Sequence, residues 1–228
     1  MKKRARGARR RNDSRRAAPL RARDAILQAA EEEFAAAGYG GARADRLAAR
    51  AKVNKALPFY YFGSKAELYA EVLRLAMQRV ANIPSIAEKR ETALPSQGCL
   101  VCFARNMFEL MARDRNLTRL IVRELIEDGD RSREFVRQYL KPLIEISVLK
   151  LSHEMEAGLV VRTDPLQILM SVFAEVFFYF VLAPVLEGMG LEDPLAPGPL
   201  AARQQTVLEL VRRGFCVDEP PGDSRGPS

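Results

Sequence analysis

Apolar residues recur every three to four positions along almost the whole chain, and this helical period constrains the fold more than any other feature. An early example is the stripe formed by Ile26, Leu27, Ala30 and Phe34. No segment alternates apolar and polar residues over the length of a strand, as a half-buried β-strand would. The 228 residues, 48% of them hydrophobic, suffice for one large domain or two small ones with a buried core. We therefore expect an all-α protein.

Capping residues, glycines and prolines set the expected helix boundaries. Ser64, with Glu67 three residues later, forms a capping box, and Asp164 followed by Pro165 is a second strong helix start. In the first 80 residues we expect helices over about 24–38, 44–51, 54–62 and 64–80. Farther along the chain we expect helices over about 97–112, 116–127, 132–157, 164–188 and 200–215.

Composition divides the chain into four parts. Pro84 and Pro95 frame a connector after the fourth expected helix, and the residues from Asp218 onward are rich in Pro, Gly and Ser, which favours disorder. We therefore expect a disordered basic tail over 1–20, a small helical domain over 21–80, a larger helical domain over 81–217 and a disordered tail over 218–228.

Positive charge is concentrated at the start of the chain. Residues 1–23 hold eleven Lys and Arg and one acid, a net charge of +10 against +7 for the whole chain. Residues 24–69 hold six basic and six acidic side chains. Two interpretations of the tail stay open. In the first, it is a solubilising extension, or the true start codon lies downstream of it; in the second, it is a flexible arm that binds phosphates or the minor groove of DNA.

Cysteine and histidine are scarce. Three cysteines and one histidine, His153, argue against a disulfide-rich secreted domain and leave little for a metal site or a catalytic triad. Cys99 and Cys102 lie in an apolar helical stripe, where cysteine is usually a small buried hydrophobe; redox or metal sensing is the alternative. No apolar stretch with a cleavage site follows the basic start. We expect a reduced cytoplasmic protein that is not an enzyme and needs neither a metal nor another cofactor.

The expected helices over 44–51 and 54–62 have the dimensions of a helix-turn-helix, over residues 43–62, whose second helix enters a major groove of DNA. Where the two helices must cross closely, Leu47 supplies a bulky side chain and Ala48 a small one. Asn54, a good N-cap residue, would open the second helix, and Lys55 and Tyr60 would project from its first turns. This pattern predicts a DNA-binding domain.

The same segment resembles the DNA-binding domain of TetR/AcrR-type transcriptional regulators. The matching runs are Ile26-Leu27-x-Ala29-Ala30-x-x-x-Phe34-x-x-x-Gly38-Tyr39, then Leu47-Ala48-x-x-Ala51-x-Val53-Asn54-Lys55, then Tyr61-Phe62-x-Ser64-Lys65-x-x-Leu68. The resemblance covers about residues 21–80. It implies a homodimeric bacterial regulator, usually a repressor, that acts on nucleoid DNA in the cytoplasm and is released from its operator by a small molecule.

Several positions depart from the family pattern. Lys52 stands where the family usually has the glycine of the turn, so a non-glycine residue must adopt a left-handed or strained conformation. Ala56 replaces a common glycine, and Pro58 lies at about the fourth position of the recognition helix. Phe59 lacks the hydroxyl of the usual tyrosine. Arg43 replaces a Ser or Thr, and its guanidinium is able to make the same phosphate contact.

Three sets of candidate site residues follow. The expected DNA-binding residues are Arg43, Arg46, Asn54, Lys55, Ala56, Phe59, Tyr60 and Lys65. The candidates for a pocket that takes an apolar small-molecule effector are Phe103, Met107, Met111, Leu143, Phe173, Glu175 and Phe177, with His153 as a further polar anchor. The expected dimer interface uses Leu169, Phe178, Leu182, Val207, Leu208 and Val211.

The stretch from Leu166 to Leu186 is long and apolar enough to suggest a membrane span. Glu175 at its centre and Pro184 near its end favour a helix buried in a protein core and dimer interface, so we expect no membrane partner. A helical scaffold or lipid-binding protein without DNA-binding activity is the alternative to a regulator.

Overall fold

The computed structural model describes the backbone of residues 2–82, 99–126, 129–190 and 192–217, and side chains from residue 21 onward within these ranges except Cys99. The expected connector over 83–98 and the expected C-terminal tail lie outside the described residues. The chain divides into two compact units, residues 1–76 and 77–228. All regular elements of the described residues are helices, apart from one isolated antiparallel bridge between Val160 and Cys216. The all-α prediction is confirmed.

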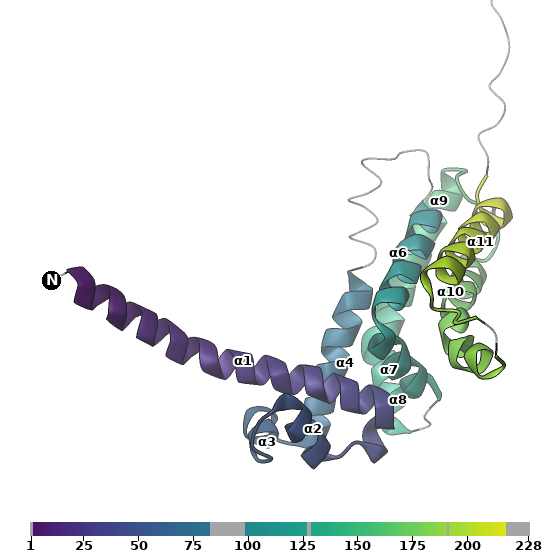
Figure 1. Ribbon diagram of the computed structural model, residues 1–228. Coiled ribbons are helices and arrows are strands. Elements are labelled where there is room, and N and C mark those ends of the chain that lie inside the picture. Colours follow the sequence, from purple (N-terminus) through teal and green to yellow (C-terminus); the bar gives the residue numbers. More distant parts are fainter. Residues whose placement is uncertain (1, 83–98, 127–128, 191, 218–228) are drawn as a thin grey trace, which may run out of the picture. The chain divides into compact units, whose positions relative to one another are not determined.

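The first unit consists of α1 (Lys2–Gly41), α2 (Ala44–Ala51), α3 (Leu57–Phe62) and most of α4 (Lys65–Ala81), shown in Figure 1. The expected apolar stripe of α1 is its buried face, and α2 and α3 both pack against this helix. Phe34 of α1 meets Tyr69 of α4 edge-on, with ring centroids 4.7 Å apart, and both side chains are almost fully buried. This aromatic contact joins the two longest helices of the unit.

The start of α1 differs from the expected disordered tail, because the structure continues this helix back to Lys2. Arg and Ala, which dominate this stretch, are strong helix formers. For residues 2–20 the structure describes the backbone alone. At its other end α1 is kinked at Gly38, where φ is 70° and where the sequence predicted the helix to stop.

The turn after α2 is closed by Lys52 in the left-handed conformation, with φ 55° and ψ 40°. The amide of Lys52 donates to the carbonyl of Ala49 (3.2 Å), and the amide of Val53 donates to that of Ala48 (3.0 Å). These two bonds are those of a Schellman motif, which normally places glycine at the left-handed position. The strained conformation predicted for Lys52 is therefore present.

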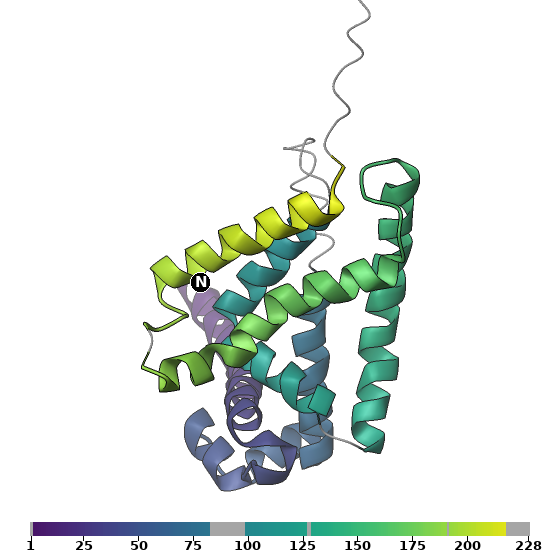
Figure 2. The ribbon, with the colours of Figure 1, turned by 90° about the vertical axis from the view of Figure 1, so that its right-hand side faces the viewer.

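The second unit contains α6 (Cys99–Arg113), α7 (Arg115–Ile126), α8 (Asp130–Phe135), η1 (Val136–Leu140), α9 (Lys141–Glu156), α10 (Pro165–Gly188) and α11 (Pro197–Phe215). Figure 2 shows α10 crossing this unit between α9 and the start of α11. Helices α10 and α11 both pack on α6. As predicted, Asp164 caps α10, where its Oδ1 accepts the amide of Leu166 at 2.8 Å.

Two helices of this unit differ from the sequence prediction. The helix expected without interruption over 132–157 passes through the π-helical turn η1, in which the amide of Lys141 donates to the carbonyl of Val136. Pro142 follows directly; it has no amide to donate, and its ring crowds the preceding turn. Helix α11 begins at Pro197, three residues before its expected start at about 200, because proline is tolerated in a first turn.

Helix α10 is long and apolar enough to cross a membrane by length and composition, with a mean hydropathy of 2.1 over its most apolar window. Its interior residues, among them Ile168, Val172 and Val176, pack within this unit. The carboxylate of Glu175 lies 2.8 Å from Arg203 of α11, which also donates to the carbonyl oxygen of Glu175. One side of α10 therefore packs in the core of this unit, as predicted, and 39% of its most apolar window is buried.

Replacing Lys52 with glycine should stabilise the first unit. A left-handed conformation costs a non-glycine residue roughly 1–2 kcal/mol, and glycine adopts it freely but loses more backbone entropy on folding. We expect Lys52→Gly to raise the free energy of unfolding by about 0.5–1 kcal/mol, measured by urea unfolding followed by circular dichroism. Lys52→Ala is the control, since it removes the same charge but keeps the Cβ atom; equal stability of the two variants would contradict the prediction.

Candidate nucleic-acid interface

The helix-turn-helix brings the expected DNA-binding residues together at one end of the first unit. Arg43 occupies the N-cap position of α2, Lys55 lies in the turn, and Tyr60 lies on α3 with 82% of its surface exposed. The other exposed members of the expected set are Arg46, Asn54 and Ala56. Phe59 and Lys65 are half-buried. The structure therefore leaves six of these eight side chains open to a partner.

The entry into α3 differs in detail from the prediction. Asn54 does not cap the helix directly; its Oδ1 accepts the amide of Ala56 at 3.0 Å, and α3 begins at Leu57. Lys55 therefore projects from the turn that precedes the recognition helix. Pro58 is within the first two residues of α3, rather than at about the fourth position, and in the first turn its missing amide is tolerated.

A sharp turn at Gly63 separates α3 from α4. Gly63 has φ 78° and ψ −71°, and the amide of Ser64 donates across it to the carbonyl of Phe62 at 3.0 Å. This is a γ-turn with positive φ, a strained form that glycine adopts most easily. Ser64 then caps α4 as predicted, because its Oγ accepts the amide of Glu67 at 3.1 Å. The turn fixes where Lys65 begins the next helix.

Two cations near this face also contact aromatic rings. The ammonium group of Lys65 lies 5.0 Å from the centroid of the Tyr39 ring, and the guanidinium of Arg23 lies 5.1 Å from that of Phe62. Arg23 also pairs with Glu71 of α4 at 2.8 Å. Hydrogen bonds from Arg74 and Arg23 hold the pKa of Glu71 below its usual range. Arg23 thus links the first and fourth helices beside the end of α3.

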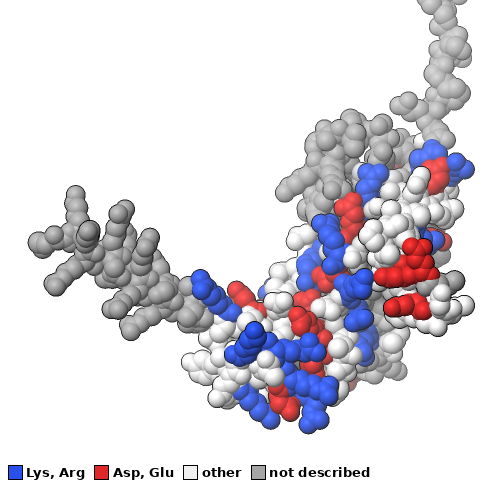
Figure 3. Space-filling model, viewed as in Figure 1, with Lys and Arg blue, Asp and Glu red and all other residues white. Residues whose placement is uncertain are grey.

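Acidic side chains lie among the cations of this face. Figure 3 shows Lys and Arg gathered over the region of α2 and α3, with Asp and Glu between them. Asp45 Oδ1 lies 3.7 Å from Arg43 Nε. A hydrogen bond from its own backbone and the charges of Arg43, Lys55 and Arg46 hold the pKa of Asp45 below its usual range. Asp45 therefore remains negatively charged throughout the neutral pH range.

Two acidic residues that were not predicted as site residues contact Arg43. Asp45 is one, and the other is Glu33, whose Oε1 accepts the amide of Arg43 at 3.3 Å. A signal for Glu33 was present, because it stands seven residues after Ile26 and three after Ala30, on the apolar face of α1. An acid at such a position is expected to have buried partners.

The expected dimer interface is partly wrong. Val207 and Val211 of α11 are fully buried in the core of their own chain, and Leu169 is 8% exposed, so these three residues do not form an outer surface. Phe178, by contrast, is 57% exposed. Leu182 and Leu208 are half-buried. An outward apolar stripe does exist on α10, and its large members are Leu166, Met170, Phe178, Val185 and Met189.

The expected pocket residues fall into three groups. Met107, Met111 and Phe177 are buried core residues, and Met111 Sδ accepts a hydrogen bond from Thr118. Glu175 pairs with Arg203 and His153 is exposed on α9, so neither has the position expected of a polar anchor. Phe103, Leu143 and Phe173 are half-buried, on α6, α9 and α10 respectively. All of the expected pocket residues stay predictions, and these three have the most accessible apolar surface.

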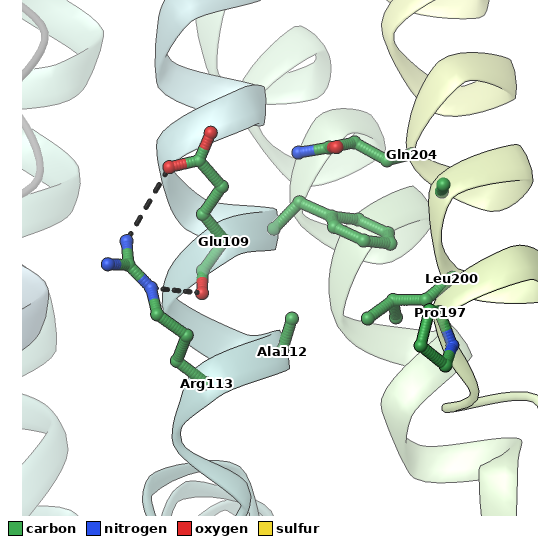
Figure 4. Close-up of a pocket in the computed structure, with 8 residues that line it drawn as sticks. Glu109, Ala112, Arg113, Pro197, Leu200 and Gln204 are labelled. Carbon is green, nitrogen blue, oxygen red and sulfur yellow. Dashed lines mark hydrogen bonds and ion pairs between the residues drawn. The ribbon is translucent and has the colours of Figure 1, made fainter.

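A hollow of about 330 Å³ lies between α6 and α11. Figure 4 shows Glu109, Ala112 and Arg113 of α6 facing Pro197, Leu200 and Gln204 of α11. Phe108 and Ala201 complete its lining. Arg113 Nε donates to the carbonyl of Glu109 at 3.1 Å. None of the expected pocket residues lines this hollow.

Comparison with known proteins gives matches of two kinds. The sequence profile of the bacterial regulatory proteins of the tetR family matches residues 26–72. The transcriptional repressor SCO4008 of Streptomyces coelicolor is 50% identical over 56 residues, which are 25% of this chain and 29% of that protein. The transcriptional regulator RutR of Escherichia coli K12 is 26% identical over 192 residues, which cover 82% of this chain and 89% of RutR.

The fold of the whole chain also has solved counterparts. The crystal structure of AibR in complex with isovaleryl coenzyme A and operator DNA has a TM-score of 0.64 and 18% sequence identity. The similarity covers 83% of this chain and 97% of AibR. At this identity the comparison shows a common fold, in which a helix-turn-helix unit is followed by a larger helical unit.

Replacing Asp45 with asparagine should strengthen binding to duplex DNA of any sequence. The change removes a fixed negative charge beside Arg43, Arg46 and Lys55 and keeps the size of the side chain. We expect the affinity for a random duplex to rise several-fold at low salt and this gain to shrink as salt is added, measured by fluorescence anisotropy. Glu187→Gln is the control, because this exposed acid lies near the end of α10. An equal gain in both variants would show that only total charge matters.

Proposed function

We propose that this chain, which belongs to the tetR family of bacterial regulatory proteins, is a homodimeric repressor that a small apolar effector releases from its operator. It would act on nucleoid DNA in the bacterial cytoplasm, as a regulator and not as an enzyme. The observation that carries the proposal is the exposed face of α2, the turn and α3. There Arg43, Lys55 and Tyr60 stand open to a partner, at the positions from which a helix-turn-helix contacts DNA.

Specific binding requires base contacts as well as phosphate contacts. We assign base contacts to Lys55 and Tyr60, because they are exposed at the entry of α3 and on α3 itself. We assign phosphate contacts to Arg43 and Arg46 on α2 and to Lys65 at the start of α4. Phe59 is half-buried and contributes packing beneath the recognition helix.

Dimerisation would use the outward apolar stripe of α10. The exposed side chains Leu166, Met170, Phe178 and Val185 stand four, eight and seven residues apart, which keeps them on one side of this helix, and Met189 follows at its C-cap. A second copy of the chain buries such a stripe with self-complementary contacts. Two recognition helices would then reach successive major grooves about one helical turn, roughly 34–36 Å, apart.

Effector binding would occur in the second unit. Phe103, Leu143 and Phe173 offer partly exposed apolar surface on three different helices, as an apolar ligand requires. AibR, which has the same fold, was solved with a coenzyme A thioester and operator DNA together, so this fold is compatible with both ligands. A coupling of about 1–3 kcal/mol between the two sites suffices for partial release.

Removing the recognition side chains tests the DNA interface. We expect Lys55→Ala and Tyr60→Ala each to weaken binding to a selected operator by about 1–3 kcal/mol, because each loses a base contact. The operator is first selected with the full chain from a random duplex pool, and affinities are then measured by gel shift. Lys141→Ala, at an exposed lysine of α9, is the matched control. Unchanged operator binding by both interface variants would rule out this recognition helix.

An acidic residue in the α10 stripe tests the dimer. Phe178→Asp should convert the purified dimer into a monomer that loses operator affinity, because it places a charge at the centre of the apolar stripe. Mass is measured by light scattering after gel filtration. Ile146→Asp is the control, since Ile146 of α9 is similarly exposed, at 52% against 57% for Phe178. A Phe178→Asp protein that remains dimeric would contradict the assignment.

A further inference from the structure

Glu33 is a buried acid in the DNA-binding unit. Only 1% of its surface is exposed, and it is the one buried charged residue among the described side chains of residues 21–76. Burial of a carboxylate is unfavourable unless hydrogen bonds and opposite charges replace the water that it loses. The position of Glu33 on the apolar face of α1 therefore has to be explained by its partners.

The two carboxylate oxygens of Glu33 contact the two ends of α2. Oε1 accepts the backbone amide of Arg43 at 3.3 Å, and Oε2 lies 3.5 Å from Nε of Arg50. Arg43 occupies the N-cap position of α2, and Arg50 lies in the last turn of this helix. A single side chain of α1 thus holds both ends of an eight-residue helix.

The hydrogen bond from the Arg43 amide to Glu33 takes the place of a capping bond that α2 does not make with its own side chains. In a capping box, an acid at the third helical position accepts the amide of the capping residue. In α2 that third position is Arg46, and Arg43 makes no side-chain cap of its own. Glu33 supplies the missing acceptor from α1.

We propose that Glu33 is a positioning residue for DNA binding, which holds the backbone of Arg43 where its guanidinium reaches a DNA phosphate. This inference rests on the proposed function, because it takes Arg43 as a phosphate contact. The backbone of Arg43 is fixed by Glu33, while its side chain stays exposed beside Asp45. Loss of the Glu33 acceptor frees the N-terminus of α2 and displaces the phosphate contact.

The neighbouring residue Glu32 provides a matched control. Its Oε2 lies 3.3 Å from Nη1 of Arg50, so it shares the ion pair at the end of α2 but has no contact with Arg43. Replacing either acid removes the same charge from the same turn of α1. Only replacement of Glu33 removes the acceptor at Arg43.

The experiment compares Glu33→Met, which is similar in size but lacks the carboxylate acceptor, with Glu33→Gln, which keeps an oxygen for the Arg43 amide. Glu32→Met and Glu32→Gln are the charge controls. Affinity of the full chain for a selected operator is measured by anisotropy over a series of salt concentrations, alongside circular dichroism of each variant. We expect Glu33→Met to bind about 5- to 10-fold more weakly, with a salt slope shallower by about one per subunit. The operator affinities of Glu33→Gln and of both Glu32 variants should remain within about twofold of that of the parent protein. Their salt slopes should equal the slope of the parent protein.

Arg43→Ala identifies the route of the effect. This variant should lose the same salt-dependent contact, and Glu33→Met added to Arg43→Ala should change affinity by less than about twofold, because the contact is already gone. If Glu33→Met does not fold, Glu33→Asp takes its place, since it keeps the charge and withdraws the carboxylate by one methylene. Its expected result is a weaker affinity and a shallower slope than those of Glu33→Gln.

Two outcomes would overturn the inference while leaving the proposed function intact. One is a folded Glu33→Met protein with the same salt slope as the parent protein. If Glu33→Asp is used in place of Glu33→Met, the same result for Glu33→Asp counts. The other is a further large loss when Glu33→Met is added to Arg43→Ala. If the parent chain selects no duplex from the random pool, the proposed function itself fails and this inference fails with it.

Discussion

The packing of α1 against its neighbours is the interaction on which the DNA-binding face depends. Helices α2 and α3 have only eight and six residues, too few to be stable helices in isolation. Leu47 and Ala48 form the buried side of α2, and the contact between Phe34 and Tyr69 holds α1 against α4. The orientation of the recognition helix is therefore set by apolar contacts made far from its exposed surface.

Electrostatics on this face acts through position and not through total charge. Residues 24–69 as a whole carry equal numbers of basic and acidic side chains, so their sum gives no net attraction for a polyanion. Within them, residues 43–62 hold five basic side chains and one acidic side chain, and the remaining acids lie outside the helix-turn-helix. Asp45 and Glu33 illustrate two uses of an acid within such a site. The first lies at the surface and lowers the local positive potential; the second is buried and ties the backbone of Arg43 to α1. Both contact the same arginine, one through its side chain and one through its amide.

In the second unit, the apolar helix α10 has a buried side and an exposed side, and both are apolar. The inner residues of α10, such as Val172 and Val176, are fully buried, while Met170 and Phe178 are about half exposed on the opposite side. The ion pair between Glu175 and Arg203 joins α10 to α11 and accommodates the charge in the middle of the apolar sequence. Burial raises the pKa of the Tyr179 phenol, one turn farther along α10 and below the same arginine. An outward apolar stripe on a helix anchored in this way is well suited to a rigid interface.

The sequence by itself determined the helical class, most helix ends and the helix-turn-helix, because period, caps and prolines act through local geometry. It predicted the cap at Asp164, the N-cap at Ser64 and the left-handed turn at Lys52, all of which are confirmed. The second bond of the predicted capping box is not formed, because the amide of Ser64 donates to the carbonyl of Phe62. Only the tertiary structure decided which side of each helix is covered. Val207 and Phe178 are both hydrophobic, yet Val207 is fully buried in its own chain and Phe178 is 57% exposed. The roles of Glu33 and Glu175 were also beyond the sequence, since each depends on an arginine from another helix. Helix propensity and capping depend on residues that are neighbours in the sequence. Burial and ion pairing depend on contacts between residues far apart in the chain.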